Sequence, residues 1–137
     1  MSKGEEVRIT SPTGGMKGSK PSQLGWVDPA ALKVLGEVAG KGAEKYGDGH
    51  NFLKGYDWQL SYDAMMRHMM AFWSGEDADP ETGLPHTAHA AWHALALTSF
   101  QLHGLGADGR WSTKRRAEAE RVSEITKSLF RIPGGAA

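Results

Sequence analysis

Apolar residues recur every three to four positions in four stretches of this chain, and that spacing is the period of an α-helix. No stretch alternates between apolar and polar residues over the length that a half-buried strand needs. We therefore predict an all-α fold, a single-domain bundle of about four helices with an extended N-terminal arm. The helices are expected at residues 29–46, 62–74, 87–103 and 112–130.

The first two predicted helices are bounded by residues that favour helix ends. Asp28 can accept a hydrogen bond from the first turn that follows it, and Gly47 can adopt the left-handed conformation that closes a helix. Ser61 and Gly75 hold the same positions around the second helix. The loop between these helices, residues 48–59, carries enough aromatic residues to fold over a pocket.

The apolar positions predict which side chains form the core. The second helix is the most apolar, so we expect it at the centre of the bundle. Three glycines lower the helix propensity of the first helix, so we expect another element to pack closely there. The glycines are Gly36, Gly40 and Gly42; the expected core residues are Leu32, Leu35, Val38 and Ala39, then Met65, Met66, Met69, Phe72 and Trp73, then Trp92, Leu95, Ala96 and Phe100.

The first 23 residues are rich in Gly, Ser, Thr, Lys and Pro and have no apolar period. This composition predicts a flexible or extended arm. The segment T-G-G-M-K-G-S-K-P offers an alternative, an anion-binding loop in which Lys17 and Lys20 supply the positive charge. We thus expect three regions: the arm at 1–23, a helical core with the metal and nucleotide site at 24–104, and a charged helix with a tail at 105–137.

Composition narrows the classes of function. The 137 residues include 16 Lys and Arg and 16 Asp and Glu, so the formal net charge is zero. This balance disfavours binding to duplex nucleic acid and favours a homo-oligomer. The absence of cysteine excludes disulfides and thiolate metal sites. No apolar segment approaches the roughly 20 residues of a membrane span, so we expect a cytoplasmic protein.

Three histidines, His86, His89 and His93, follow directly after an acidic loop. On a helix they share one stripe about 60° wide, where a core-facing stripe would carry Leu or Ile. Imidazoles beside carboxylates supply the nitrogen and oxygen donors that a divalent metal prefers. The acidic residues of the loop are Glu76, Asp77, Asp79 and Glu81.

Several interpretations of this cluster stay open. The three histidines could bind zinc, or the acids could bind Mg²⁺ or Mn²⁺ while the histidines bind phosphate. The loop lacks the ligand spacing of an EF-hand. Glu37, Lys41 and Glu44 share one face of the first helix, either as a surface row of ion pairs or with the two acids as metal ligands. The sequence has no P-loop, dinucleotide fingerprint or serine nucleophile elbow.

Several motifs together resemble a known family. They are G-G-x-K near the start, G-A-E-K-Y-G at 42–47, W-x-x-S-Y at 58–62, and R-H-x-x-A-F-W-x-G-E-D-x-D-P-E-T-G-L-P-H-x-x-H-A at 67–90. Across roughly residues 14–101 the chain resembles the small phage-encoded dATP/dGTP diphosphohydrolases, which are linked to the all-α MazG-like pyrophosphohydrolases. The resemblance implies a metal-dependent enzyme that cleaves (d)NTPs, here purine dNTPs, to monophosphate and pyrophosphate.

The resemblance also implies roles for individual residues, although the chain departs from the family pattern. MazG-type enzymes carry E-E-x-x-E and E-x-x-D motifs, whereas this chain has only Glu37 and Glu44 on the first helix and H-T-A-H at 86–89. The resemblance therefore implies metal ligation by Glu44, the acidic loop and the histidines, with Mg²⁺ or Mn²⁺ first and Zn²⁺ as an alternative. The expected metal ligands are Glu76, Asp77, Asp79, His86 and His89; water is oriented by Glu44 or Glu81; phosphate and nucleotide contacts come from Lys17, Lys20, Lys45, Tyr46, Trp58, Arg67, His68 and His93.

Two other functions remain compatible with the sequence. A nucleotide-binding protein without catalysis, such as a phage protein that sequesters a nucleotide signal, would need the same pocket. A metal phosphohydrolase similar to the HD-domain group would also use helical His and Asp, but no adjacent His-Asp pair occurs in the chain.

Overall fold

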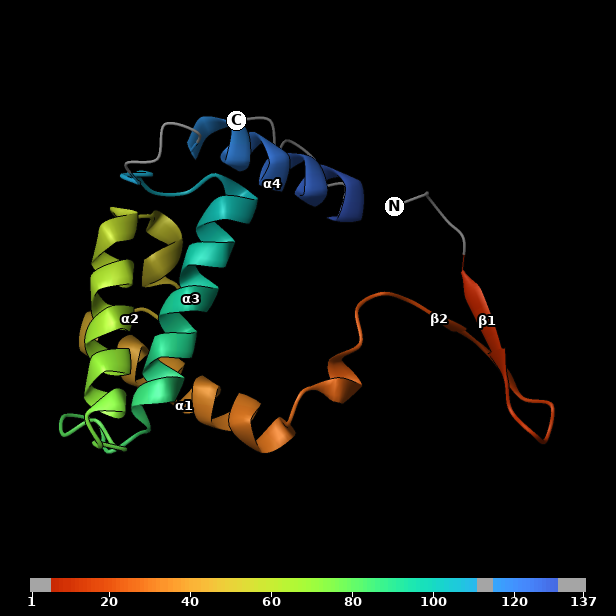
Figure 1. Cartoon of the computed structure of the whole chain (residues 1–137), viewed down its shortest axis with the longest axis horizontal. Coiled ribbons are helices and arrows are strands. Elements are labelled where there is room, and N and C mark those ends of the chain that lie inside the picture. Colours follow the sequence, from red (N-terminus) through yellow and green to blue (C-terminus); the bar gives the residue numbers. More distant parts are fainter. Residues whose placement is uncertain (1–5, 111–114, 131–137) are drawn as a thin grey trace.

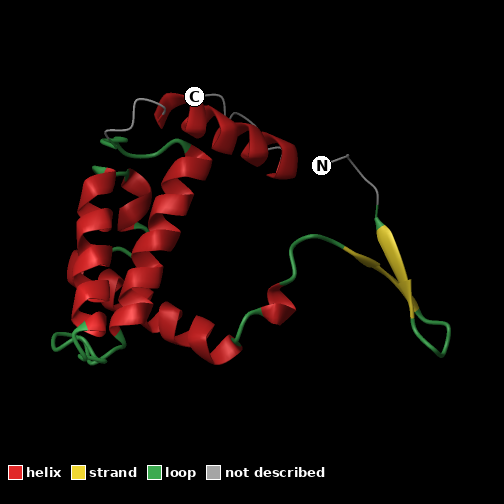
Figure 2. Ribbon diagram, viewed as in Figure 1, coloured by secondary structure: helices red, strands yellow, loops and turns green. Residues whose placement is uncertain are grey.

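The computed structural model describes residues 6–110 and 115–130. The described chain forms four α-helices and one small two-stranded sheet (Figures 1 and 2). The predicted all-α bundle with an N-terminal extension is therefore confirmed, although residues 112–114, where we expected the fourth helix to begin, lie outside the described residues. The helices are α1 at Pro29–Tyr46, α2 at Trp58–Trp73, α3 at His86–His103 and α4 at Arg115–Phe130.

The central helix of the bundle is α3. It lies beside α2 along most of its length, and it also packs against α1 near one end and α4 near the other (Figure 1). The prediction that the second helix is central was wrong, because the described residues cover only one side of α2. None of the described helices combines the length and apolar character that a membrane span requires.

The ends of α1 follow directly from its capping residues. The Asp28 carboxylate accepts a hydrogen bond from the Ala30 N–H at 3.0 Å, and Gly47 has a φ of 72°. Both predicted boundaries are confirmed.

The start of α2 differs from the prediction. The helix begins at Trp58 with Asp57 as its N-cap, so Ser61 is an interior residue rather than a cap. A distant segment fixes this start: the Trp58 indole N–H donates to the Leu105 carbonyl at 2.8 Å. Gly106, with a φ of 73°, permits the close approach, because an added Cβ would lie 2.3 Å from a backbone oxygen.

The apolar core is small. Among the described residues, its buried hydrophobic side chains are those of Val38, Ala90, Ala96 and Phe100. Leu95 is 54% exposed and Trp73 is 87% exposed, so these two core predictions were wrong. The core predictions for Leu32, Ala39, Met66 and Met69 were wrong as well, because these residues are also exposed. The prediction that another element packs closely against the glycines of α1 was wrong too, because a Cβ added at Gly36, Gly40 or Gly42 would meet no neighbouring atom within 4 Å.

The N-terminal arm contains a β-hairpin that the sequence pattern did not predict. Strand β1 (Val7–Thr10) pairs antiparallel with β2 (Met16–Ser19), and a short 3₁₀ turn at Leu24–Trp26 leads into α1. Each strand has four residues and neither has a buried face, so the alternation that marks a half-buried strand is missing. The hairpin lies well apart from the helices (Figure 1).

Candidate functional site

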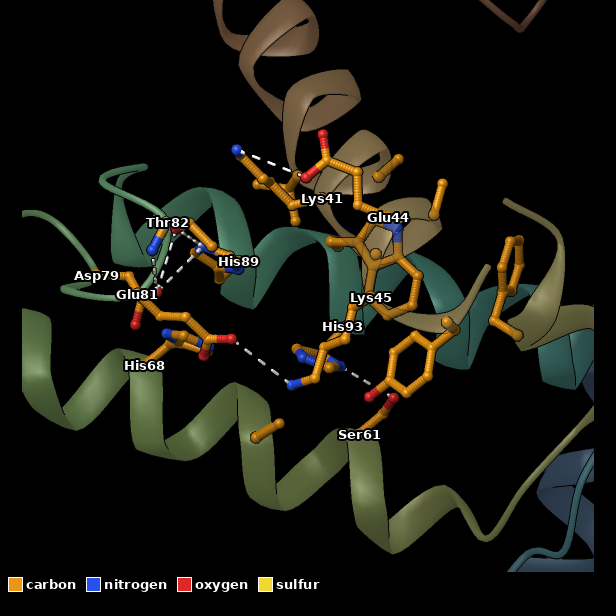
Figure 3. Close-up of a pocket in the computed structure, with 18 of the residues that line it drawn as sticks. Lys41, Glu44, Lys45, Ser61, His68, Asp79, Glu81, Thr82, His89 and His93 are labelled. Atoms are coloured by element: carbon orange, nitrogen blue, oxygen red, sulfur yellow. Dashed lines mark hydrogen bonds and ion pairs between the residues drawn. The ribbon is translucent and has the colours of Figure 1, made fainter. Parts of the chain in front are cut away.

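A cleft of about 1160 Å³ lies between α1, α2 and α3 and is bordered by the loop that joins α2 to α3 (Figure 3). Ligand pockets in proteins commonly have volumes of roughly 300 to 1,000 Å³. The cleft is therefore large enough for a nucleotide. Most of the polar side chains singled out in the sequence line it, and the loop brings the acids onto the first turns of α3.

The loop between α2 and α3 is folded by its own backbone hydrogen bonds. The Asp79 N–H donates to the Leu84 carbonyl at 2.8 Å, and the Gly83 N–H donates to the Asp79 carbonyl at 2.7 Å. At its end, the His86 N–H donates to the Asp77 carbonyl at 2.9 Å. These bonds hold the Asp79 side chain over the beginning of α3.

His68 on α2 and His86 on α3 meet across the two helices. Their Nδ1 atoms lie 2.9 Å apart, and His86 Nε2 lies 2.7 Å from a carboxylate oxygen of Glu76. A carboxylate only accepts, so the His86 proton is on Nε2 and its Nδ1 carries a lone pair. His68 Nδ1 therefore donates to His86. A histidine held by a carboxylate in this way is characteristic of metal sites.

Asp79, Thr82 and His89 form a second group beside the first. The Thr82 backbone N–H and hydroxyl both donate to Asp79 Oδ2 at 3.1 Å, and the same hydroxyl lies 2.6 Å from His89 Nε2. Since the hydroxyl proton is directed to Asp79, His89 Nε2–H donates to Thr82. Burial alone would raise the pKa of Asp79, but the hydrogen bonds from Thr82 and the neighbouring His89 lower it. Asp79 is therefore ionised at neutral pH.

Among the described residues, His68, Asp79 and His86 each offer one ligand atom, and these atoms all lie within 4.8 Å of one another. Burial, together with the neighbouring His89, lowers the pKa of His68. Metal ligation needs neutral imidazoles and ionised carboxylates, so the lowered pKa values of His68 and Asp79 suit a divalent ion. The ring of His89 stacks on that of His68, with centroids 4.6 Å apart, and burial lowers the pKa of His89 as well.

A hydrogen-bonded chain of three side chains lies further along the cleft. The Tyr56 hydroxyl lies 2.5 Å from Ser61 Oγ, which lies 3.0 Å from His93 Nδ1. The phenol is the stronger acid, so Tyr56 donates to Ser61 and Ser61 donates to His93. Burial lowers the pKa of His93 to about 4 and raises that of Tyr56. His93 is thus neutral, with its proton on Nε2.

Two pairs of opposite charges lie at the mouth of the cleft (Figure 3). Lys45 Nζ is 3.9 Å from a carboxylate oxygen of Glu81, and Lys41 Nζ is 3.8 Å from one of Glu44. All four side chains are largely exposed, so each pair contributes little to stability and is free to exchange partners. These lysines are available to an anionic ligand.

The structure brings most of the predicted site residues together. Four do not line the cleft: Asp77 has an exposed side chain, Lys17 and Lys20 belong to the hairpin arm, and the Trp58 ring lies against Arg110 with the guanidinium 5.0 Å from the ring centre. The predicted residues that do line the cleft are Glu44, Lys45, Tyr46, Arg67, His68, Glu76, Asp79, Glu81, His86, His89 and His93.

Sequence reasoning missed four polar residues that line the cleft: Asp48, Asn51, Ser61 and Thr82. Ser61 lies seven positions before His68, which places both on one face of α2, so a polar residue on that face was a usable signal. Thr82 lay within the acidic loop, but nothing in the spacing distinguished it. The predicted aromatic loop does contribute to the cleft, through Phe52 and Tyr56.

Comparisons with known proteins identify the family of this chain. A family model described as dATP/dGTP diphosphohydrolase, N-terminal, matches residues 11–110. A protein of Salmonella phage PMBT28 named dATP/dGTP diphosphohydrolase is 35% identical over 98 residues, which are 70% of this chain and 32% of that protein. This chain thus spans about a third of the length of that relative. No solved structure matches. The chain belongs to the dATP/dGTP diphosphohydrolase N-terminal family.

Proposed function

We propose that this chain binds purine deoxynucleoside triphosphates in the cleft and hydrolyses them to the monophosphate and pyrophosphate with the help of a divalent ion. One observation carries the proposal: carboxylates and imidazoles converge in a nucleotide-sized cleft that lies within the family-matched residues. The name of the phage relative supports the substrate class.

The positive side chains near the mouth of the cleft suit the phosphates. Lys45 contacts Glu81, and Arg67 also lines the cleft. A triphosphate carries more charge than one carboxylate, so we expect it to take Lys45 from Glu81. The freed carboxylate then faces the bound nucleotide, where it can accept a proton.

The reaction that we propose is the attack of water on the α-phosphorus. The water oxygen forms the new bond, the bond from the α-phosphorus to the bridging oxygen breaks, and pyrophosphate leaves with the electron pair. Glu81 or Glu44 orients the water and accepts its proton. A bound divalent ion supplies stabilisation of the charge on the phosphate oxygens. Tyr46, exposed beside Lys45, is the candidate for stacking on the base.

Product analysis tests this proposal. Pure protein is incubated with a panel of dNTPs and NTPs and a divalent ion, and the products are separated by anion-exchange chromatography. We expect dAMP or dGMP and pyrophosphate, and a fall of at least about tenfold in kcat for Glu81→Gln. Lys54→Ala is the matched control, because Lys54 forms a similar exposed ion pair, with Asp48 at 3.7 Å, but does not line the cleft.

Other products would contradict the proposal. Nucleoside and triphosphate would indicate chemistry similar to the HD-domain group. Retention of nucleotide without turnover would indicate a binding protein. The homo-oligomer expected from the zero net charge stays a prediction, which light scattering during size-exclusion chromatography tests.

A further inference from the structure

We propose that His68, Asp79 and His86 form a nitrogen-rich centre for one transition-metal ion of the Mn²⁺ to Zn²⁺ series, and that this centre discriminates against Mg²⁺. The inference deepens the proposed function, on which it rests for the role of the ion, by naming the class of metal. The centre differs from the predicted ligand set, because it includes His68 from α2 and leaves out Glu76, Asp77 and His89 as ligands.

The distance between the two imidazoles is the first argument. His68 Nδ1 and His86 Nδ1 lie 2.9 Å apart and come from different helices. Two nitrogens bound to one ion at about 2.0–2.1 Å lie roughly 3 Å apart, so little movement separates the present geometry from shared ligation. A bound ion would replace the proton that His68 Nδ1 donates to His86 Nδ1. His68 would then carry its proton on Nε2.

Glu76 is the second argument, because it orients His86 for this role. His86 is buried, and its Nε2–H donates to the Glu76 carboxylate at 2.7 Å. The bond fixes the ring and the tautomer, so the Nδ1 lone pair is directed at His68 rather than at solvent. Partners of this kind orient metal-binding histidines and raise their basicity. Glu76 is therefore a positioning residue in the proposed centre.

Asp79 supplies the oxygen donor, and its own partners hold it in place. Two hydrogen bonds from Thr82 restrain Oδ2, and His89 Nε2 lies 3.8 Å from the same atom. Because His89 donates its Nε2 proton to Thr82, that nitrogen is not available to an ion. We therefore assign Thr82 and His89 as positioning residues for Asp79.

The donor set determines which ions fit. Two imidazole nitrogens and one carboxylate suit borderline ions, whose affinity for nitrogen rises from Mn²⁺ towards Cu²⁺. Mg²⁺ prefers oxygen ligands and gives up its water reluctantly. The carboxylates of Asp79 and Glu76 together match the charge of a divalent ion. The same site without its histidines would favour Mg²⁺.

Binding of Co²⁺ to the full chain tests the centre without any nucleotide. Co²⁺ bound by protein nitrogen gives visible absorption bands, and titration followed by competition with Mn²⁺, Zn²⁺ and Mg²⁺ gives relative affinities. We expect one Co²⁺ per chain, displaced by Zn²⁺ but not by a hundredfold excess of Mg²⁺. We expect His68→Ala and Asp79→Asn to weaken binding at least tenfold.

Two further variants keep the test decisive. His103→Ala is the matched control, because His103 is an exposed histidine at the other end of α3. This variant should bind Co²⁺ as tightly as the wild type does. Glu76→Gln retains the shape of the side chain and should weaken binding about 10- to 100-fold. Far-UV circular dichroism verifies that each variant is folded.

The outcomes separate this inference from the proposed function. Displacement of Co²⁺ by Mg²⁺ at similar concentration, or wild-type Co²⁺ binding by both His68→Ala and Asp79→Asn, would overturn the centre. Tight Co²⁺ binding without dNTP hydrolysis would leave the centre standing and remove the proposed function. Hydrolysis with Mg²⁺ alone, in a protein that does not bind Co²⁺, would remove the centre and leave the proposed function standing.

Discussion

Replacement of Ser61 by alanine tests whether the Tyr56–Ser61–His93 chain stabilises the wall of the cleft. Ser61 is fully buried, and its Oγ is the one atom that joins the other two side chains. The substitution removes this oxygen and little else. Its cost therefore reflects the hydrogen bonds rather than a change in packing.

The magnitude follows from the surroundings of the two partners. An unsatisfied buried polar group costs about 1–3 kcal/mol. Tyr56 and His93 are only half-buried, so water can replace part of each bond, and about 2 kcal/mol in total is a reasonable value. Alanine returns up to about 0.5 kcal/mol of helix propensity. We expect a net loss of about 1.5 kcal/mol in the free energy of unfolding, or roughly 5 °C in Tm.

Urea unfolding followed by far-UV circular dichroism measures the loss. Ser128→Ala is the matched control, because Ser128 is an exposed serine on α4 and should show only the gain in helix propensity. A double-mutant cycle with Tyr56→Phe measures the coupling between the two hydroxyls, which we expect to exceed about 0.5 kcal/mol. A smaller coupling, with Ser61→Ala as stable as Ser128→Ala, would refute the reasoning.

Three further changes have definite expected results. The pKa of His93 in the folded chain, about 4, lies below its ordinary value of 6.5. Between these two pH values the unfolded chain therefore binds more protons, so stability should fall as the pH drops from about 6.5 to about 4. Tm measurements should show a smaller fall for His93→Gln than for the wild type. Gly106→Ala should lower the free energy of unfolding, measured with urea, by at least about 2 kcal/mol, because Gly106 has a φ of 73° and lies against the Tyr56 carbonyl. Gly36→Ala, in open space on α1, should raise it by about 0.5–1 kcal/mol. Equal effects of the two substitutions would contradict the packing described. Thr82→Val should raise the pKa of Asp79, since it removes the hydroxyl donor, and an unchanged carboxyl titration by NMR would show that this bond is unimportant.

The sequence predicted features that depend on neighbouring residues. The ends of α1 followed from Asp28 and Gly47, whose conformations are local. The start of α2 did not, because the indole of Trp58 binds a carbonyl 47 residues away. The small hairpin was missed for a different reason: its strands have no buried face, so no pattern of apolar residues marks them.

In the candidate site, too, features set by spacing within one helix were predictable, whereas contacts between helices were not. The stripe of His86, His89 and His93 was visible because helical spacing alone places these residues on one face. The pairing of His68 with His86 depends on how α2 packs against α3, which no spacing within one helix reveals. Lys17 was predicted to contact phosphate from a glycine-rich motif and a family resemblance, and neither carries information about where the arm lies.

The short loop between the paired helices has a consequence for the order of folding. His68 and His86 are 18 residues apart, and Glu76 and Asp79 lie between them. Loop-closure entropy is small over such a distance, and contacts close in sequence form early. An ion captured by this segment would join α2 to α3 before α1 or α4 has docked. Refolding started in the presence of the ion should therefore be faster than refolding in a chelator, with the α-hairpin acting as the nucleus on which the remaining helices assemble.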